Sequence, residues 1–333
     1  MTASILSAIP RRAAALALAA SAVGLLAATA VAQTPGWPNR PVKIVVPFPP
    51  GGTTDIAARA IGEEMSKSIG QPVIVENRPG ANTNIGSSYV ARSPGDGYTM
   101  LMASSSVTTN PSLYKSLDYD TARDLVGVHL VTDVALVMAV HPSIADATVA
   151  DLVRRVKASG KPLNCGSSGN GSLAHLSCVL LKNRTGMDVQ HVPYKGGAPM
   201  IADLIGGQVD VAFDTPAGTL PHVQAGRLRA LATTGTSRIA AYPGVPTMRE
   251  AGVADFEIVW WAGLLAPSGT PPALVARLHE EVGRALRSPS VVERFGKLGI
   301  VASTESQPDY AARIRRDIDT WSKLARSAGL SID

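Results

Sequence analysis

The chain has 333 residues, of which 45% are hydrophobic and 17% charged, and its formal net charge is +5. This mild positive balance, with no clustered basic face and no interleaved aromatic residues, argues against nucleic-acid binding. After its N-terminal segment, the sequence has no second apolar stretch long enough to span a membrane. The length allows one large or two ordinary α/β domains, and we expect two.

The N-terminal segment has the pattern of an export signal. Arg11 and Arg12 precede an alanine- and leucine-rich stretch that runs to about Leu26, and small residues then form a cleavage site before Gln33. A membrane anchor is the alternative, but the apolar core is short for a spanning helix. We predict that residues 1–32 are a cleaved signal peptide, by either the general or the twin-arginine route, and that the protein is periplasmic. Loss of both arginines lowers the net charge to +3.

Strand-prone and helix-prone segments alternate along most of the chain. Strands are expected at 42–46, 73–76, 99–103, 163–165, 189–192, 209–213 and 228–232. Residues 56–65 have helical spacing, and Thr148 with Asp151 forms a capping box at the start of another helix. Such alternation is typical of parallel sheets that are covered by helices.

Two long strand-prone runs, 125–140 and 256–265, interrupt this alternation and end at His-Pro and Ala-Pro steps. They bracket a block of strands and helices, which indicates paired crossovers between two lobes. We therefore expect a discontinuous first lobe of residues 36–136 and 262–333 and a second lobe of residues 137–261. Amphipathic helices at about 272–286, 291–298 and 308–328 would cover the first lobe.

Two glycine pairs, Gly51-Gly52 and Gly196-Gly197, each follow a β-branched run and precede a helix-forming stretch. Glycine permits positive φ, and we expect the second glycine of each pair to have such an unusual backbone conformation. The unpaired N–H groups at the start of the following helix would form an anion site. Two such sites that face each other predict that the protein binds a small anion between them, and that this anion has a polar group at each of its ends. Asp55, in the first helical turn, is more typical of a residue that stabilises the helix dipole.

The segment GSSGNGSLAH, residues 166–175, permits three interpretations. A dinucleotide loop is disfavoured because no acidic residue stands about twenty positions further on. A nucleophile elbow at Ser168, completed by His175 and Asp214, lacks the second glycine of that motif. The third interpretation is a polar loop whose small side chains leave backbone N–H groups open to a ligand. The histidines are scattered without metal-ligand spacing, so we expect neither a metal nor a cofactor.

Two questions stay open from the residues alone. Cys165 and Cys178 either form a disulfide in an exported protein or are two small buried side chains. Trp260 and Trp261 either line a cleft or fill the core beside a strand.

From about Pro38 to the C-terminus the sequence resembles the extracytoplasmic solute receptors of the tripartite tricarboxylate transporter system, often called Bug proteins. The motifs that carry the resemblance are PFPPGGTTDIAAR, VENRPGANTNIGS, GDGYTMLM, HVPYKGGAP, GGQVDVAFD, AGRLRALATT, PGVPTMREAG and GLLAPSGTP. The resemblance implies a periplasmic binding protein of type II, an α/β fold with two lobes joined by two crossover strands and the ligand in the interlobe cleft.

The resemblance also implies a receptor that is not an enzyme, and we expect a monomer. Its partners would be a small organic mono-, di- or tricarboxylate, which the sequence does not identify, and inner-membrane permease subunits. A sensory receptor is an alternative, and a hydrolase that uses Ser168 and His175 is a weaker one. The ligand contacts carried over from the family are Phe48, Gly51, Gly52, Thr53, Thr54, Asp55, Asn84, Ser104, Ser105, Ser106, Ser167, Ser168, Ser172, His175, Gly196, Gly197, Ala198 and Asp214. The two cysteines, and Asn82-Thr83 where small glycines are usual, depart from the family pattern.

Overall fold

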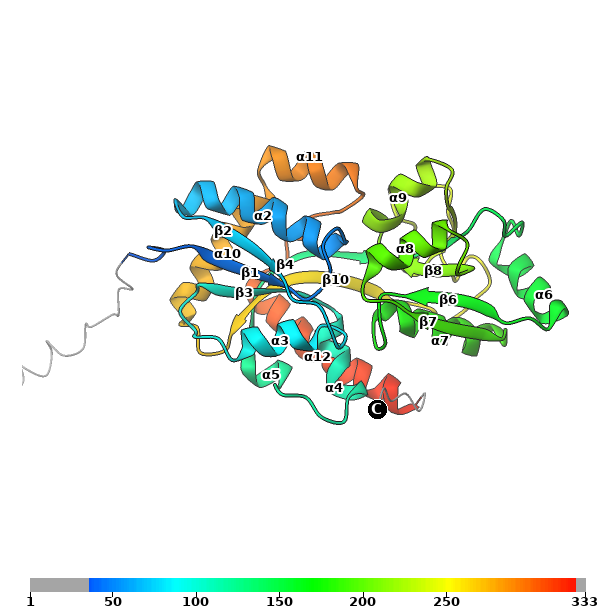
Figure 1. Cartoon of the computed structure of the whole chain (residues 1–333), viewed down its shortest axis with the longest axis horizontal. Coiled ribbons are helices and arrows are strands. Elements are labelled where there is room, and N and C mark those ends of the chain that lie inside the picture. Colours follow the sequence, from blue (N-terminus) through cyan, green and yellow to red (C-terminus); the bar gives the residue numbers. More distant parts are fainter. Residues whose placement is uncertain (1–35, 328–333) are drawn as a thin grey trace, which may run out of the picture. The chain divides into compact units, whose positions relative to one another are not determined.

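The computed structural model describes residues 36–327 (Figure 1). The predicted signal peptide, residues 1–32, lies outside the described residues. Within the described residues, the chain from Arg40 onward forms one compact unit that contains two five-stranded sheets. Within residues 36–327, no helix is both long enough and apolar enough to cross a membrane.

The first sheet has the strand order β2-β1-β3-β10-β4. Its strands are β1 (Val42–Val46), β2 (Val73–Asn77), β3 (Thr99–Ser104), β4 (Leu125–Ala135) and β10 (Val259–Pro267). Strand β1 pairs in parallel with β2 and β3, whereas β10 runs antiparallel to β3 and β4. Helices cover both faces of the sheet (Figure 1): on one side α2 (Thr53–Ile69), α10 (Pro272–Leu286) and α11 (Pro289–Lys297), on the other α3 (Asn84–Ala91), α4 (Ser106–Leu113), α5 (Thr121–Asp124) and α12 (Gln307–Ser327).

The second sheet repeats this plan with the order β7-β6-β8-β5-β9. Its strands are β5 (Val137–Val140), β6 (Leu163–Ser167), β7 (Val189–Pro193), β8 (Val211–Asp214) and β9 (Arg229–Thr233). Helices α8 (Gly197–Ile205) and α9 (Pro216–Gln224) lie on one side, and α6 (Val149–Ser159) and α7 (Leu173–Thr185) on the other (Figure 1). A separate apolar cluster lies between the sheet and each helix layer. Because both faces of the sheet are buried, the sequences of its strands are nearly continuous apolar runs.

The long run at 125–140 is two strands, because the chain leaves the first sheet and enters the second at Leu136. The return connection lies between β9 and β10, and Thr234 joins both connections. Its hydroxyl accepts a hydrogen bond from the Leu136 N–H at 2.9 Å and donates one to the Ile258 carbonyl at 2.6 Å. Its backbone bonds to the same two residues. The predicted pair of crossovers is therefore present, and one buried threonine ties them together.

The two tryptophans on β10 point to opposite faces of the sheet, as consecutive strand residues do. The Trp261 side chain is buried, its indole Nε1 donates to Asp317 Oδ2 at 2.7 Å, and its ring meets Tyr310 edge-on. Trp260 is partly exposed and lines a cavity. Strand β10 starts at Val259, inside the stretch assigned to the second lobe, and the exact lobe limits stay a prediction.

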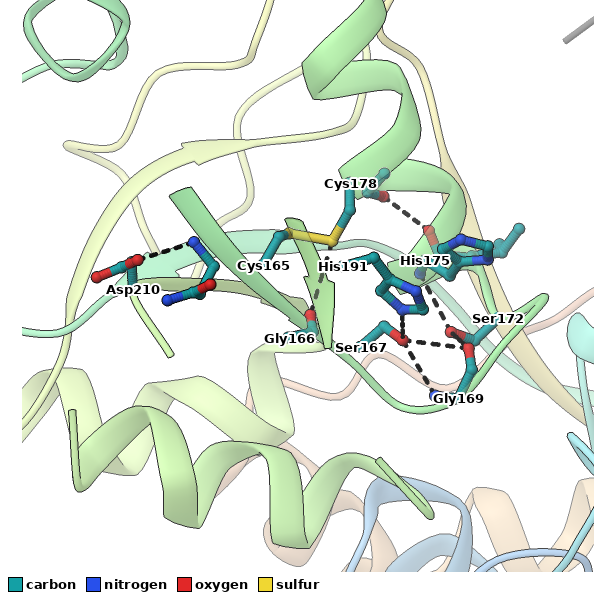
Figure 2. Close-up of a disulfide and its surroundings, with 12 residues drawn as sticks. Cys165, Gly166, Ser167, Gly169, Ser172, His175, Cys178, His191 and Asp210 are labelled. Carbon is teal, nitrogen blue, oxygen red and sulfur yellow. Dashed lines mark hydrogen bonds between the residues drawn. A yellow bond between two sulfur atoms is a disulfide. The ribbon is translucent and has the colours of Figure 1, made fainter. Parts of the chain in front are cut away.

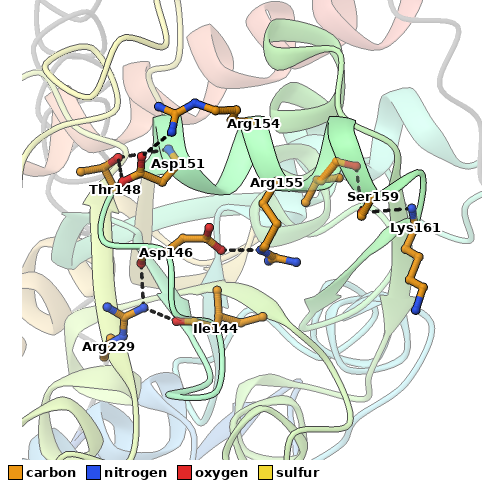
Figure 3. Close-up of polar contacts among 10 residues, drawn as sticks. Ile144, Asp146, Thr148, Asp151, Arg154, Arg155, Ser159, Lys161 and Arg229 are labelled. Carbon is orange, nitrogen blue, oxygen red and sulfur yellow. Dashed lines mark hydrogen bonds and ion pairs between the residues drawn. The ribbon is translucent and has the colours of Figure 1, made fainter.

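Helix α6 begins with the predicted Thr148 and Asp151 pair (Figure 3). The Thr148 hydroxyl accepts from the Asp151 N–H at 3.1 Å, which satisfies one unpaired donor of the first turn. The same hydroxyl donates to the Asp151 carboxylate at 2.8 Å, so the acidic side chain pairs with the cap and does not return to the cap's backbone N–H. Asp146 lies just before the helix: its carboxylate accepts from Arg155 of α6, and its carbonyl accepts from Arg229 of β9.

Cys165 of β6 and Cys178 of α7 are joined by a disulfide of 2.05 Å, with their Cα atoms 6.0 Å apart (Figure 2). Both side chains are buried in the cluster between the second sheet and α7. The bond therefore fixes the loop that connects β6 to α7.

We expect the protein purified from the periplasm to show at most a partial free-thiol signal when it is unfolded without reductant. The same sample unfolded with reductant should release both thiols. Replacing both cysteines by alanine should lower the free energy of unfolding by about 3 kcal/mol, because a closed loop of this length restricts the unfolded chain. Complete labelling of both thiols in unreduced protein, folded and unfolded, would contradict the disulfide.

Candidate functional site

A cavity of about 310 Å³ lies at the carboxyl ends of strands from both sheets. The loop between β1 and α2 forms one side, and the loops after β6, β7 and β8 form the other. Ligands of open α/β sheets bind at such strand ends. The predicted contacts that line the cavity are Phe48, Gly51, Gly52, Thr53, Thr54, Ser168, Gly196, Gly197, Ala198 and Asp214.

Several lining residues were not predicted from the sequence. They are Pro49, Ile56, Pro199, Ile201, Ala202, Ile205, Thr215, Ala217, Gly218 and His222, whereas Trp260 follows the first of the two alternatives that the sequence left open for it. Most are apolar and lie along α8 and α9 or directly before them, so their pattern is that of ordinary amphipathic helices. The Pro at the start of α9 was the one local signal for a third helix that begins at the cavity.

The first glycine of each pair makes the turn out of the strand. Gly51 has φ of 91° and Gly196 has φ of 124°. The expectation that the second glycine has the unusual φ is wrong: Gly52 has φ of −81°, and Gly197 is the first residue of α8. Each first glycine turns the chain, so the second is free to take the ordinary conformation from which a helix starts.

Asp55 stabilises the loop that contains Gly51 and Gly52. Its carboxylate accepts hydrogen bonds from the Gly51 N–H at 3.0 Å, from Arg59 at 3.0 Å and from Asn77 at 2.9 Å. Burial alone would raise the pKa of Asp55, but these bonds from Arg59, Gly51 and Asn77 outweigh it and lower that pKa. Asp55 does not line the cavity, so its role here is to position the loop.

The two sides of the cavity touch directly. The Thr53 and Thr215 hydroxyl oxygens lie 2.6 Å apart, and Thr109 of α4 donates to the Gly171 carbonyl at 2.8 Å. A Cβ placed on Gly196 would lie 3.1 Å from Pro49 Cδ, a tight contact, and the φ of 124° there also disfavours any side chain, so glycine suits this close approach of the two loops. The structure therefore has the lobes in contact around the cavity.

In the part of the chain that the structure describes, three helices begin at the cavity without a side-chain cap: α2, α8 and α9. The first N–H groups of a helix have no partner within the helix, and the helix dipole makes this end attractive to anions. Among residues 36–327, no hydrogen bond is made by the N–H groups of Thr53 and Thr54 on one side or of Gly197 and Ala198 on the other. Backbone donors from both lobes thus border one cavity.

Asp214, the last residue of β8, contributes a carboxylate to the wall of the cavity. Its Oδ1 accepts from the Thr215 N–H at 2.8 Å. Burial raises the pKa of Asp214 to about 7, although the Thr215 hydrogen bond acts in the opposite direction. None of the described residues that line this cavity is Lys or Arg.

Ser167, Ser172 and His175 support the loop after β6 (Figure 2), and they line neither this cavity nor the neighbouring one that shares Phe48 and Ser168 with it. The Ser172 hydroxyl caps α7 by accepting from the His175 N–H, and His175 Nδ1 accepts from the Gly171 N–H. Ser167 lies 2.6 Å from His191 Nε2.

The imidazoles of His175 and His191 stack at 3.9 Å. Burial lowers the pKa of His175, and burial together with the His175 charge lowers the pKa of His191 to about 4. The described contacts of His175 include neither Ser168 nor Asp214, so the hydrolase triad is not assembled.

The remaining predicted contacts are also placed away from the cavity. Asn84 Oδ1 accepts from Asn110 at 2.6 Å and from Tyr119 at 3.0 Å. Residues 104–106 are buried where β3 leads into α4. These side chains support the first lobe behind the cavity.

A smaller cavity of about 240 Å³ shares Phe48 and Ser168 with the larger one. Residues 79–83 and 193–195 contribute to its walls. Asn82 and Thr83 have φ of 45° and 79°, so the chain keeps a left-handed backbone with non-glycine residues there. Asn82 Nδ2 donates to Asn110 Oδ1 at 2.7 Å, which anchors its side chain to α4.

Two α/β lobes with mixed sheets, two connections between them and a cavity at the strand ends define a two-lobed binding protein of the periplasmic type. The chain belongs to the tripartite tricarboxylate transporter family of receptors, whose sequence profile matches residues 57–330.

Individual relatives agree with this assignment. The chain is 36% identical to BugT of Bordetella pertussis over 316 residues, which is 93% of this chain and 97% of that protein. It is also similar to the solved structure of Rpa4515 of R. palustris with adipate, with a TM-score of 0.84 and 37% identity over 89% of this chain and all of the other. MatC of Rhodopseudomonas palustris with bound malate gives a TM-score of 0.82 and 32% identity, covering 86% of this chain and 99% of the other. The family is one of receptors, and the similar solved structure of BugD, with 34% identity and a TM-score of 0.84, is that of a periplasmic binding protein, so this chain is a receptor and not an enzyme.

Proposed function

We propose that this chain is a periplasmic receptor that captures a small organic carboxylate between its lobes and delivers it to the inner-membrane permease subunits of a tripartite tricarboxylate transporter. One observation carries the proposal: the uncapped starts of α2 and α8, one from each lobe, border the same cavity. The adipate and malate in the two similar structures support the choice of a carboxylate. The proposal includes export of the protein and removal of its signal peptide by cleavage after residue 32.

Capture works by lobe closure. Ligand oxygens that accept from N–H groups of both lobes lower the free energy of the closed state, and a ligand that touches one lobe does not shift the equilibrium. We assign direct contact to the residues around Gly51-Gly52 and Gly196-Gly197, to Ser168 and to Asp214. The other predicted residues act by positioning: Asp55, Asn84, Ser104, Ser105, Ser106, Ser167, Ser172 and His175.

A screen of mono-, di- and tricarboxylates should find at least one that raises the melting temperature of the purified protein. Binding to the folded state alone stabilises it by about 2.7 kcal/mol at a hundredfold excess over Kd. Neutral amides and alcohols of the same chain length serve as matched controls and should give smaller shifts. The proposal fails if no carboxylate shifts the transition and mass spectrometry of the native protein finds no copurified acid.

A further inference from the structure

The Asp214 carboxylate places a negative group inside the cavity proposed to hold an anion. Its Oδ1 is bound by Thr215, but no described residue donates to Oδ2. A Cβ on Gly218 would lie 2.2 Å from Oδ2, and a Cβ on Gly197 would lie 3.1 Å from it. Glycine at the start of both α8 and α9 therefore leaves room for this carboxylate. The space around the unpaired Oδ2 oxygen is therefore provided by the sequence at the start of these two helices.

No charged side chain of the surrounding elements neutralises Asp214. The titratable groups facing this region are Asp55 and Arg59 of α2, Lys195 before α8, His222 of α9 and Tyr242 after β9. Arg59 is bound to Asp55, and the exposed Lys195 lines the smaller cavity.

The two remaining titratable groups, His222 and Tyr242, are neutral near pH 7 and therefore do not balance the charge of Asp214. His222 Nδ1 accepts from Arg227 at 2.7 Å, so the ring proton is on Nε2, and burial with the Arg227 charge lowers the pKa of His222. The Tyr242 hydroxyl lies 2.7 Å from Thr219 Oγ1, and burial raises its pKa to about 12. The cavity thus contains one acidic group without a cationic partner.

Two carboxylates in one poorly solvated site repel each other unless they share a proton. Asp214 is only partly exposed, and a carboxylate oxygen that a ligand covers without giving it a donor is also costly. We infer that Asp214 is the specificity-determining acceptor of the site, and that the ligand is an organic acid that presents a hydrogen-bond donor to Asp214 Oδ2 while its carboxylate lies at the N–H groups of α2 and α8.

This inference rests on the proposed function and names the class of its ligand. A hydroxyl, amide or ammonium group can supply the donor directly. A dicarboxylate can supply it only by taking one proton from solvent, which the second carboxyl group and Asp214 then share; no covalent bond between heavy atoms forms or breaks. The two sources of the donor are therefore distinguishable by proton uptake.

The test compares hexanoate, adipate and the hydroxyl-, amide- and ammonium-ended acids of the same chain length, by calorimetry on the mature protein. The three donor-bearing acids should bind at least tenfold more tightly than hexanoate. Adipate binding at about pH 8 should take up close to one proton, measured in buffers of different ionisation enthalpy, whereas the ammonium-ended acid should take up none.

Asp214→Asn should abolish this proton uptake and reverse the ranking of the end groups: adipate should gain and the ammonium-ended acid should lose at least tenfold in affinity. Asp188→Asn removes an equally charged but exposed side chain of the same lobe and should leave the ranking unchanged. If Asp214→Asn does not fold, the proton uptake of the wild type decides the question alone.

An unchanged ranking in folded Asp214→Asn, or adipate binding by the wild type without proton uptake, overturns the role of Asp214. In either case carboxylates still bind, so the proposed function survives. Absence of any binding across the series and across the wider carboxylate panel overturns the proposed function itself.

Discussion

Thr234→Val is expected to lower the free energy of unfolding by about 2 to 5 kcal/mol, because two buried hydrogen bonds disappear together. The substitution keeps the shape of the side chain but removes the hydroxyl that binds Leu136 and Ile258. All three residues are at most 2% exposed, so water does not replace the lost partner. Urea unfolding of the purified variant measures the loss.

The neighbouring residue provides a matched control. The Thr233 hydroxyl is buried and has no hydrogen-bond partner among the described residues, so Thr233→Val should be neutral or slightly stabilising. Thr234→Ser keeps the hydroxyl and should cost only about 1 kcal/mol, from one lost methyl group. Equal losses in the two valine variants would show that the hydroxyl of Thr234 is not the reason for the effect.

Gly52→Ala and Gly197→Ala are each expected to weaken ligand binding at least tenfold, about 1.4 kcal/mol, if backbone N–H groups hold the carboxylate. An added methyl at Gly52 meets no atom within 4 Å, so it leaves the free protein intact and obstructs only a ligand at the loop. The methyl at Gly197 would lie 3.1 Å from Asp214 Oδ2 and also displaces that group. Titration with the best acid from the screen measures both losses.

Gly296→Ala is the control for the glycine change, because Gly296 is exposed on α11 and an added Cβ there has no neighbour within 4 Å. His175→Ala should cost less than tenfold, since its Nδ1 supports the Gly171 backbone and its ring does not line the cavity. If both alanine variants at Gly52 and Gly197 bind like the wild type while His175→Ala abolishes binding, the backbone mechanism is wrong.

Much of the candidate site could be predicted from the sequence, because it depends on local backbone conformation. A β-branched run, a glycine pair and a helix-forming stretch predict a strand, a turn and a helix start from neighbouring residues alone. The turn then forms at Gly51 and Gly196, which have φ of 91° and 124°. The choice between the two glycines of each pair was missed, since the sequence pattern is the same whichever of them turns.

The serine-rich loop shows where local reasoning ends. Ser167 and Ser168 are adjacent and chemically alike, yet Ser168 lines the cavity while Ser167 binds His191. Their directions depend on the pairing of β6 with β7, which brings a histidine from a distant part of the chain beside one of them. Side-chain identity carries no information about such a partner.

The sequence by itself determined the alternation of strands and helices and the two glycine turns, because these follow from periodicity and from short-range conformational preferences. It also determined the family and the class of fold, through the resemblance of its motifs to those of the family. Only the tertiary structure decided that the run at 125–140 divides at Leu136, that Trp260 faces the cavity while Trp261 fills the core, and that Asp214 Oδ2 is left without a donor. Each of these depends on residues far apart in the chain that sheet pairing and helix packing bring together. The free energy of those long-range contacts, and not any local preference, selects the arrangement.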